Sequence, residues 1–155
     1  VSADTMVVHI PTYMLTTDVI KTWRIIESSN SRNIMRAVYI DPNSVAVCDF
    51  ALLERLEHLN AVKQYIIDNP EAKFINLTLF RVFLQDYLNH HKFINHDQLT
   101  VVRYLSQLDK GALPLEVFAF TATSEFTKFE QIQADIFEHI FAMLPVFNLR
   151  IYRQA

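Results

Sequence analysis

The sequence predicts an α+β protein: a ferredoxin-like split βαβ sandwich over residues 33–155, preceded by a fragment of separate β structure over residues 1–32. From Asn33 onward the hydrophobic patterns run strand, helix or helix pair, strand, strand, helix, strand, which is the ferredoxin-like order. The β-rich stretches before Asn33 do not fit into that order. A length of 155 residues, 51% of them hydrophobic, suits one globular domain with a small additional unit.

Residues 1–40 are expected to form strands because they are rich in Val, Ile, Thr, Tyr and Trp. The expected strands span residues 5–10, 19–26 and 33–40. The first two cannot close a barrel by themselves, since they leave a hydrophobic face and edges unpaired. One face of the third strand carries Ile34, Arg36, Val38 and Ile40, and the other carries Met35, Ala37 and Tyr39. Both faces are largely apolar, which predicts a central strand.

Helical patterns occupy the next fifty residues. A helix over residues 49–67, capped by Asp49, is predicted by apolar residues three or four positions apart: Leu52, Leu53, Leu56, Leu59, Val62 and Ile66. Asn69-Pro70 ends or interrupts it. A second stretch to residue 88, capped by Asn76 or Thr78, carries a stripe of Leu77, Phe80, Leu84 and Leu88. The two stretches can act as one interrupted crossover.

The last third of the chain predicts a hairpin, a helix and a closing strand. Strands over residues 98–105 and 115–121 are joined by the turn residues Asp109-Lys110-Gly111. The helix begins near Thr127, which can form a capping box with Glu130, and ends before Pro145. Its expected inward residues are Phe129, Ile132, Ile136, Phe137, Ile140, Phe141 and Leu144. Residues 147–152 are expected to form the closing strand.

Composition and charge argue against several classes of function. A net charge of −3 lacks the positive excess that binds a phosphate backbone, so we expect no nucleic-acid partner. The single glycine, Gly111, disfavours glycine-rich nucleotide-binding loops, and the single Cys48 rules out an internal disulfide and a zinc cluster based on cysteines. No stretch approaches the roughly 20 consecutive apolar residues that span a bilayer.

Four side chains within eight residues, His90, His91, His96 and Asp97, are of the types that bind zinc or nickel. Their spacing is loose, and a polar segment after an amphipathic helix is expected in any case, so we predict no metal here. Asp135 and His139 are four positions apart, and a solvated pair on one helix face is favoured over an acid–base dyad. Cys48 beside a helix start could be a reactive thiol with a lowered pKa, but a structural cysteine is favoured.

Phe118 and Phe120 share a strand face with Glu116, as in RNA-recognition folds. Without a basic surround, they are better interpreted as core residues packed against the helices. No motif of a hydrolase, metalloprotease or P-loop enzyme is present in the sequence. We therefore expect no enzymatic activity and no cofactor.

Five blocks of sequence resemble the miniconductance (MscM-like) branch of the small-conductance mechanosensitive channel family. Ile10-Pro11-Thr12-Tyr13-Met14-Leu15 and Lys21-Thr22-Trp23-Arg24 are similar to the end of that branch's β domain, after the pore helix. Residues 113–121 (LPLEVFAFT), 131–139 (QIQADIFEH) and 149–152 (LRIY) are similar to its later strand, helix and end. The blocks occur in the family's order along the chain.

The resemblance implies that residues 1–32 are the C-terminal part of an Sm-like channel β domain and residues 33–155 its α/β cytoplasmic domain. It places Pro11, Thr12, Tyr13, Trp23 and Arg24 in the β-domain motif or at a subunit interface. It implies a heptameric ring at the cytoplasmic side of the bacterial inner membrane, whose vestibule passes ions and small solutes under osmotic stress. The parent membrane helices are absent from this sequence, so this piece would assemble and filter but not conduct. A stand-alone ferredoxin-like ligand-binding regulatory domain is the alternative.

Overall fold

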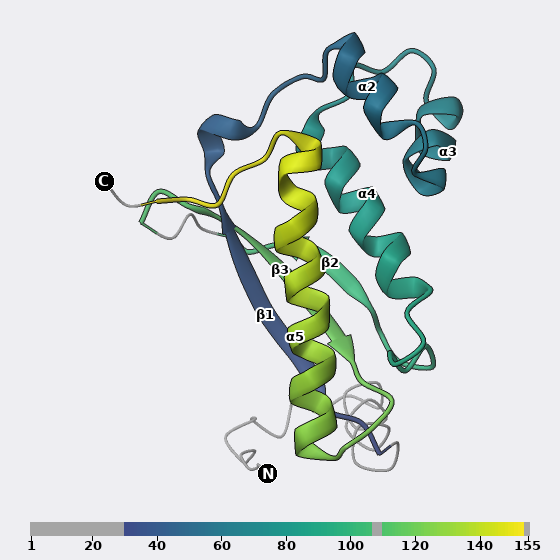
Figure 1. The fold of residues 1–155 in the computed structure, drawn as a ribbon, viewed down its shortest axis with the longest axis vertical. Coiled ribbons are helices and arrows are strands. Elements are labelled where there is room, and N and C mark those ends of the chain that lie inside the picture. Colours follow the sequence, from purple (N-terminus) through teal and green to yellow (C-terminus); the bar gives the residue numbers. More distant parts are fainter. Residues whose placement is uncertain (1–29, 107–109, 154–155) are drawn as a thin grey trace, which may run out of the picture.

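The computed structural model describes residues 30–106 and 110–153. They form an α+β fold around a three-stranded antiparallel sheet (Figure 1). The strands are β1 (Asn33–Ile40), β2 (Val101–Tyr104) and β3 (Leu113–Phe120), in the order β1-β3-β2. The predicted α+β class is therefore confirmed for this part of the chain. The strands expected at residues 5–10 and 19–26 lie outside the described residues.

Two long helices cover one face of the sheet. They are α4 (Asn76–Asn89) and α5 (Phe126–Met143), which run next to each other across the strands in Figure 1. The shorter α2 (Phe50–Leu56) and α3 (Asn60–Asp68) lie beyond the start of α4. Single 3-10 turns, η3 (Pro42–Ser44) and η4 (Leu144–Phe147), follow β1 and α5.

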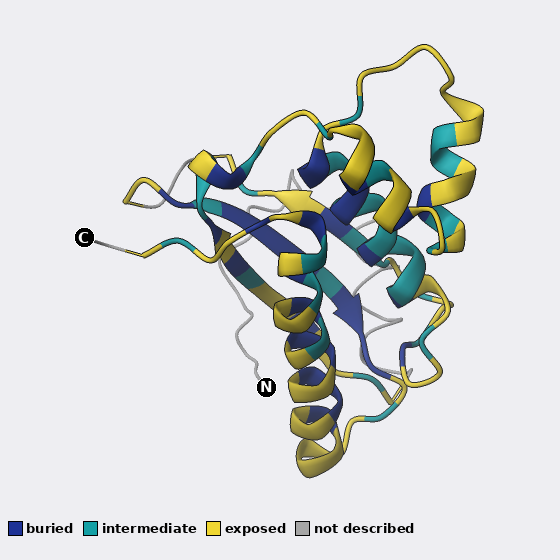
Figure 2. Cartoon of the chain, turned by 45° about the horizontal axis from the view of Figure 1, so that its top comes forward, coloured by how far each residue is buried: buried dark blue, intermediate teal, exposed yellow. Residues whose placement is uncertain are grey.

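The core lies between the sheet and these helices, where Figure 2 shows the inner surfaces as buried. Alternate residues of β3 point into it, and Leu115, Val117 and Ala119 have no exposed surface. The predicted apolar stripe of α4 is buried throughout, at Leu77, Phe80, Leu84 and Leu88. Burial of these side chains, each worth about 1.5–3 kcal/mol for a large aliphatic or aromatic group, fixes the two helices on the sheet.

The opposite face of the sheet carries the residues that alternate with the core. Met35 is 60% exposed on β1, and its β3 partner Phe118 is half-buried. Phe118 and Phe120 therefore point away from α4 and α5, and the prediction that they pack against the helices is wrong. They do share their face with Glu116, which is buried and paired to Arg103 of β2 at 2.9 Å.

The predicted helix over residues 49–67 is two helices. Asp49 caps α2 as expected, with its carboxylate accepting from the Leu52 amide at 2.8 Å. The chain then turns at Glu57 and His58, where the Leu59 amide donates to the Leu56 carbonyl before α3 begins. The break lets Leu56 and Val62 both reach full burial although α2 and α3 point in different directions.

The caps predicted for α4 and α5 are not formed. Ile75 precedes α4, and Asn76, the expected cap, is buried inside the first turn with other hydrogen-bond partners. In α5 the helix begins at Phe126 after Glu125 without a side-chain cap, so the Thr127–Glu130 capping box is wrong. Phe141 of α5 is 49% exposed rather than buried, because it lies one position past the buried Ile140 on the outer side of the helix.

The closing strand expected over residues 147–152 is reduced to a single bridge. Phe147 belongs to η4, Asn148 takes a left-handed conformation with φ of 60°, and only Ile151 pairs with Ile40 of β1. β1 is thus flanked by β3 on one side and by this bridge on the other, which falls short of the fully central strand that was predicted.

The turn before β3 requires its glycine. Gly111 has φ of 92°, and a Cβ at this position would lie 3.0 Å from the Tyr152 hydroxyl. β2 and β3 pair as the expected hairpin. Tyr152, in the C-terminal segment, lies against the turn at Gly111. Among the described residues, no helix has the length and apolar character needed to cross a membrane.

Candidate functional site

The residues singled out from the β-domain motif, Pro11, Thr12, Tyr13, Trp23 and Arg24, lie outside the described residues. Of the remaining candidates, the histidines, Asp97 and Asp135 lie near the C-terminal end of α4, where the loop of residues 90–97 packs near α5, and Cys48 lies at the other end of α4.

The histidine-rich loop does not form a metal site in the described residues, where no three His, Cys, Asp or Glu side chains are placed to hold an ion. Instead, its histidines make contacts within the loop and with the end of α4. His90 Nδ1 lies 3.2 Å from the Asp86 carboxylate, and His96 Nε2 lies 2.8 Å from the His91 carbonyl. His91 Nδ1 accepts from the Phe93 amide at 3.1 Å, so its neutral ring carries its proton on Nε2.

His139 of α5 stacks on Tyr87 of α4, with ring centroids 4.4 Å apart, and His91 meets the edge of the same Tyr87 ring. No hydrogen bond joins His139 to Asp135, so the predicted helix-face pair is replaced by an aromatic contact between helices. The sequence could not show this contact because Tyr87 and His139 are 52 positions apart.

Burial sets the protonation of this cluster. Desolvation lowers the pKa of His91, and the Asp135 carboxylate opposes that shift. Desolvation also raises the pKa of Tyr87, reinforced by Asp135. Both groups are thus held in their neutral forms near pH 7.

Cys48 lies at the other end of α4, where its amide donates to the Phe74 carbonyl at 2.7 Å. Burial raises the pKa of its thiol, and the neighbouring Asp49 carboxylate raises it further. The lowered pKa considered for a reactive thiol is therefore wrong, and the structural interpretation is favoured.

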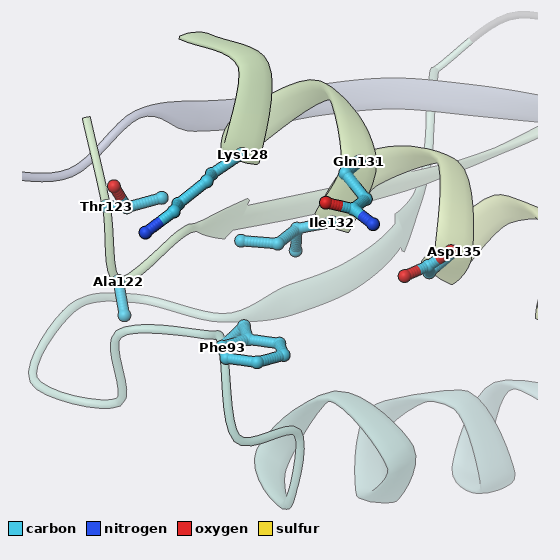
Figure 3. A pocket seen from close by; sticks show the side chains of 7 residues that line it. All are labelled: Phe93, Ala122, Thr123, Lys128, Gln131, Ile132 and Asp135. Carbon is cyan, nitrogen blue, oxygen red and sulfur yellow. The ribbon is translucent and has the colours of Figure 1, made fainter. Parts of the chain in front are cut away.

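A groove of about 520 Å³ opens between α5 and the loop that follows α4 (Figure 3). Its α5 side carries Lys128, Gln131, Ile132 and Asp135, and its other side carries Phe93, Ala122 and Thr123. A volume of this size is within the range of small-molecule sites. The spacing of the four α5 residues is a signal in the sequence, because residues at i, i+3, i+4 and i+7 share one helix face. From the sequence, Asp135 is expected in a polar surface pair, but Lys128 and Gln131 are not identified as site residues.

The loop wall of the groove is fixed by backbone hydrogen bonds. The Ala122 amide donates to the Phe93 carbonyl at 2.8 Å, and the Asn95 amide donates to the Phe120 carbonyl at 2.7 Å. Ile94 and Thr121 form a β-bridge between these contacts. Phe93 is thereby held over the groove although 47% of its surface is exposed.

The polar groups of the groove are suited to binding rather than to covalent chemistry. Lys128 has one weak ion pair, with Glu125 at 3.9 Å, while Gln131 and Asp135 make no hydrogen bond or ion pair in the described part of the chain. Among the described residues that line the groove, no nucleophile has an adjacent base. The residues that line the groove offer one cation, one anion and one amide beside the Phe93 ring, and Lys92 Nζ lies 5.0 Å from the centroid of the same ring. No protein-family model matches this sequence.

Proposed function

We propose that this chain is the vestibule portion of a bacterial mechanosensitive channel subunit, of the miniconductance branch of the small-conductance family. In this proposal residues 1–32 complete an Sm-like β domain and residues 33–155 form a ferredoxin-like domain. The domain acts without enzymatic activity or a cofactor, on the cytoplasmic side of the inner membrane. Seven copies assemble in the full-length channel, which releases ions and small solutes under osmotic stress.

The observation that carries the proposal is where the three later sequence blocks lie. Residues 113–121 include all of β3, the central strand of the sheet. Residues 131–139 form the middle of α5, where Ile132, Ile136 and Phe137 are buried. Residues 149–152 contain Leu149, which is buried, and Ile151, which pairs with β1. The resemblance therefore falls on residues that build one core, which supports a shared fold over a chance match of surface segments.

Strand order supports the ferredoxin-like part of the proposal. The sheet runs β1-β3-β2 with antiparallel neighbours, and the Ile40–Ile151 bridge adds the end of the chain beside β1. Both long helices lie on one face (Figure 1). A split βαβ sandwich has this order, with the first and last strands adjacent and the helices on one side.

The exposed apolar surface supports assembly with other subunits. Large apolar side chains are well exposed on the sheet face opposite α4 and α5, at Met35 and Tyr39, and at the start of α2, at Val47 and Phe50, the last of which is 77% exposed. Apolar surface gathered in this way is typical of protein interfaces.

The test is an electrophysiological recording. The complete gene that encodes this chain is expressed in bacterial cells lacking their own mechanosensitive channels, and excised patches are held under increasing suction. We expect a conductance that opens with membrane tension and improved survival of the cells after osmotic downshock. The matched control is the same gene ending before residue 30, which should produce no openings because the vestibule cannot assemble.

Two outcomes would overturn the proposal: a complete gene without hydrophobic helices before this segment, or normal expression in the membrane with no tension-gated current. The alternative, a ligand-binding regulatory domain, is favoured by one observation, the groove beside α5.

A further inference from the structure

The groove beside α5 has opposite charges at its two ends. Lys128 and Asp135 are seven positions apart on one face of the helix. At 1.5 Å of rise per residue, seven positions correspond to about 10 Å along the helix axis. In Figure 3 the Lys128 amine extends toward Thr123, away from Asp135, so the two charges do not approach each other.

The middle of the groove combines an amide with apolar surface. Gln131 lies between the two charged residues, and its side chain makes no hydrogen bond in the described residues, so both its donor and its acceptor are available. Ile132 and the Phe93 ring provide apolar contact on the two walls (Figure 3). The hydrogen bonds that fix residues 93–95 to residues 120–122 mean that the groove is formed before a ligand arrives.

We propose that this groove binds short peptides in their zwitterionic form, with an optimum near three residues. The terminal carboxylate pairs with Lys128 and the terminal amine with Asp135. Gln131 bonds to a central peptide group, and the central side chain packs between Ile132 and Phe93. The inference does not depend on the channel proposal, because it concerns only the described domain.

Length selects this class of ligand. An extended peptide advances about 3.3–3.6 Å per residue, so the two charged ends of a tripeptide are separated by about 10 Å. The Lys128 amine extends away from Asp135, so the two side-chain charges lie farther apart than the helix rise between their backbone positions, and a tripeptide fits between them. A single amino acid carries both charges on one Cα and cannot reach both ends of the groove. A nucleotide or polyphosphate would place several negative charges beside Asp135 and is disfavoured.

The binding experiment uses the whole 155-residue chain. Alanine, dialanine, trialanine and trialanine blocked at both ends are titrated at low salt, and backbone amide shifts are followed by NMR. We expect trialanine to bind at least threefold more tightly than alanine or the blocked peptide, with the largest shifts at Ala122, Thr123 and Gln131. Equal binding of the blocked and free tripeptides, or shifts centred elsewhere, would overturn the proposal.

Variants then test the two ends. Lys128→Met and Asp135→Asn should each weaken trialanine binding about two- to fivefold, the value of an exposed ion pair. Glu130→Gln, on the opposite side of α5, and Lys63→Met, on α3, are matched charge controls that should leave binding unchanged. Affinity lost equally in the controls would mean that net charge alone is responsible and would contradict the proposal.

The double variant K128E/D135K gives the sharpest result. It reverses both charges, so the peptide should bind in the opposite direction with affinity close to that of the wild type, whereas K128E alone should lose binding. The binding experiments use the isolated 155-residue chain. Peptide binding can therefore be absent while tension-gated current is observed, and peptide binding can be observed while the current is absent. The two proposals are therefore tested separately.

Discussion

The two ends of α4 are surrounded by polar groups of different kinds. At the N-terminal end, Asn76 is 1% exposed and every polar atom of its side chain is bonded. Its amide group donates to the Ser44 and Phe147 carbonyls at 2.9 Å each, and its oxygen accepts from the Ala46 amide at 2.9 Å. At the C-terminal end, Tyr87 and His91 are half-buried, and Asp135 has no hydrogen-bond partner in the described residues.

The difference separates a structural polar group from an available one. A buried amide with all its hydrogen bonds formed connects three distant segments and has nothing left to offer a ligand. Partly exposed titratable side chains that keep unused polar atoms lose little hydration when a ligand binds, and they add little to stability. We therefore expect substitutions at the N-terminal end to change folding, and those at the C-terminal end to change binding and protonation.

The largest expected effect is that of Asn76→Ala. It leaves two buried carbonyls and one partly buried amide without their Asn76 partner, at about 1–3 kcal/mol for each unsatisfied group. The free energy of unfolding, measured by urea denaturation, should fall by about 3–5 kcal/mol. Asn69→Ala is the control, since its amide makes one exposed bond to the Tyr65 carbonyl and should cost under about 0.5 kcal/mol. Similar losses in both variants would remove the distinction between the two ends.

A smaller loss is expected for Tyr87→Leu. The substitution keeps an apolar side chain but removes the stack on His139 and the edge contact with His91, contacts worth about 0.5–1.5 kcal/mol. Tyr87→Phe keeps the ring and should be nearly neutral in the same denaturation experiment. If the leucine variant were as unstable as Asn76→Ala, the C-terminal end would be structural as well.

Cys48 gives a chemical test of the N-terminal end. Asp49→Asn removes the charge that raises the pKa of the thiol while keeping a good helix cap, so more thiolate should form. The rate of alkylation by iodoacetamide at pH 7.5 should rise, because the thiolate is the form that reacts. An unchanged rate, with unchanged stability, would show that burial alone controls the thiol.

The smallest effect is a change in pH dependence at His91. Its pKa is lower in the folded chain than the usual 6.5, so the unfolded chain binds more protons between these two pKa values. Stability should therefore be greatest above pH 6.5 and fall as the pH decreases through that window. His91→Asn, whose side-chain oxygen can still accept from the Phe93 amide, should reduce this fall below pH 6.5. A steeper fall of stability in the variant would contradict this prediction.

Periodicity predicted the elements that bury a continuous apolar stripe. The α4 stripe, the helix near residues 127–144 and the hairpin turn at Gly111 followed from spacing and from turn chemistry, which are local properties. The errors fall where local signals compete. Asn76 and Thr127 are residue types that cap helices well. However, the Asn76 side chain donates to the Ser44 and Phe147 carbonyls, and α5 starts one residue before Thr127.

The candidate site was less predictable than the fold. His91 and Asp135 were noticed in the sequence, but in separate hypotheses, as a loose metal cluster and as a helix-face pair. Nothing local in the sequence marks Phe93, an exposed aromatic residue, as the wall of a groove. Lys128 and Gln131 occupy a face of α5 that reads as ordinary solvated surface.

By itself, the sequence determined the class of the fold, the buried faces of α4 and α5, and the charge that disfavours nucleic acid. These depend on composition and on spacing within one element. Only the tertiary structure decided that Asn76 would join segments 32 and 71 positions away, and that Phe93 would face Lys128 and Asp135 across a groove. Such contacts depend on how whole elements pack, so no local pattern of residues specifies them.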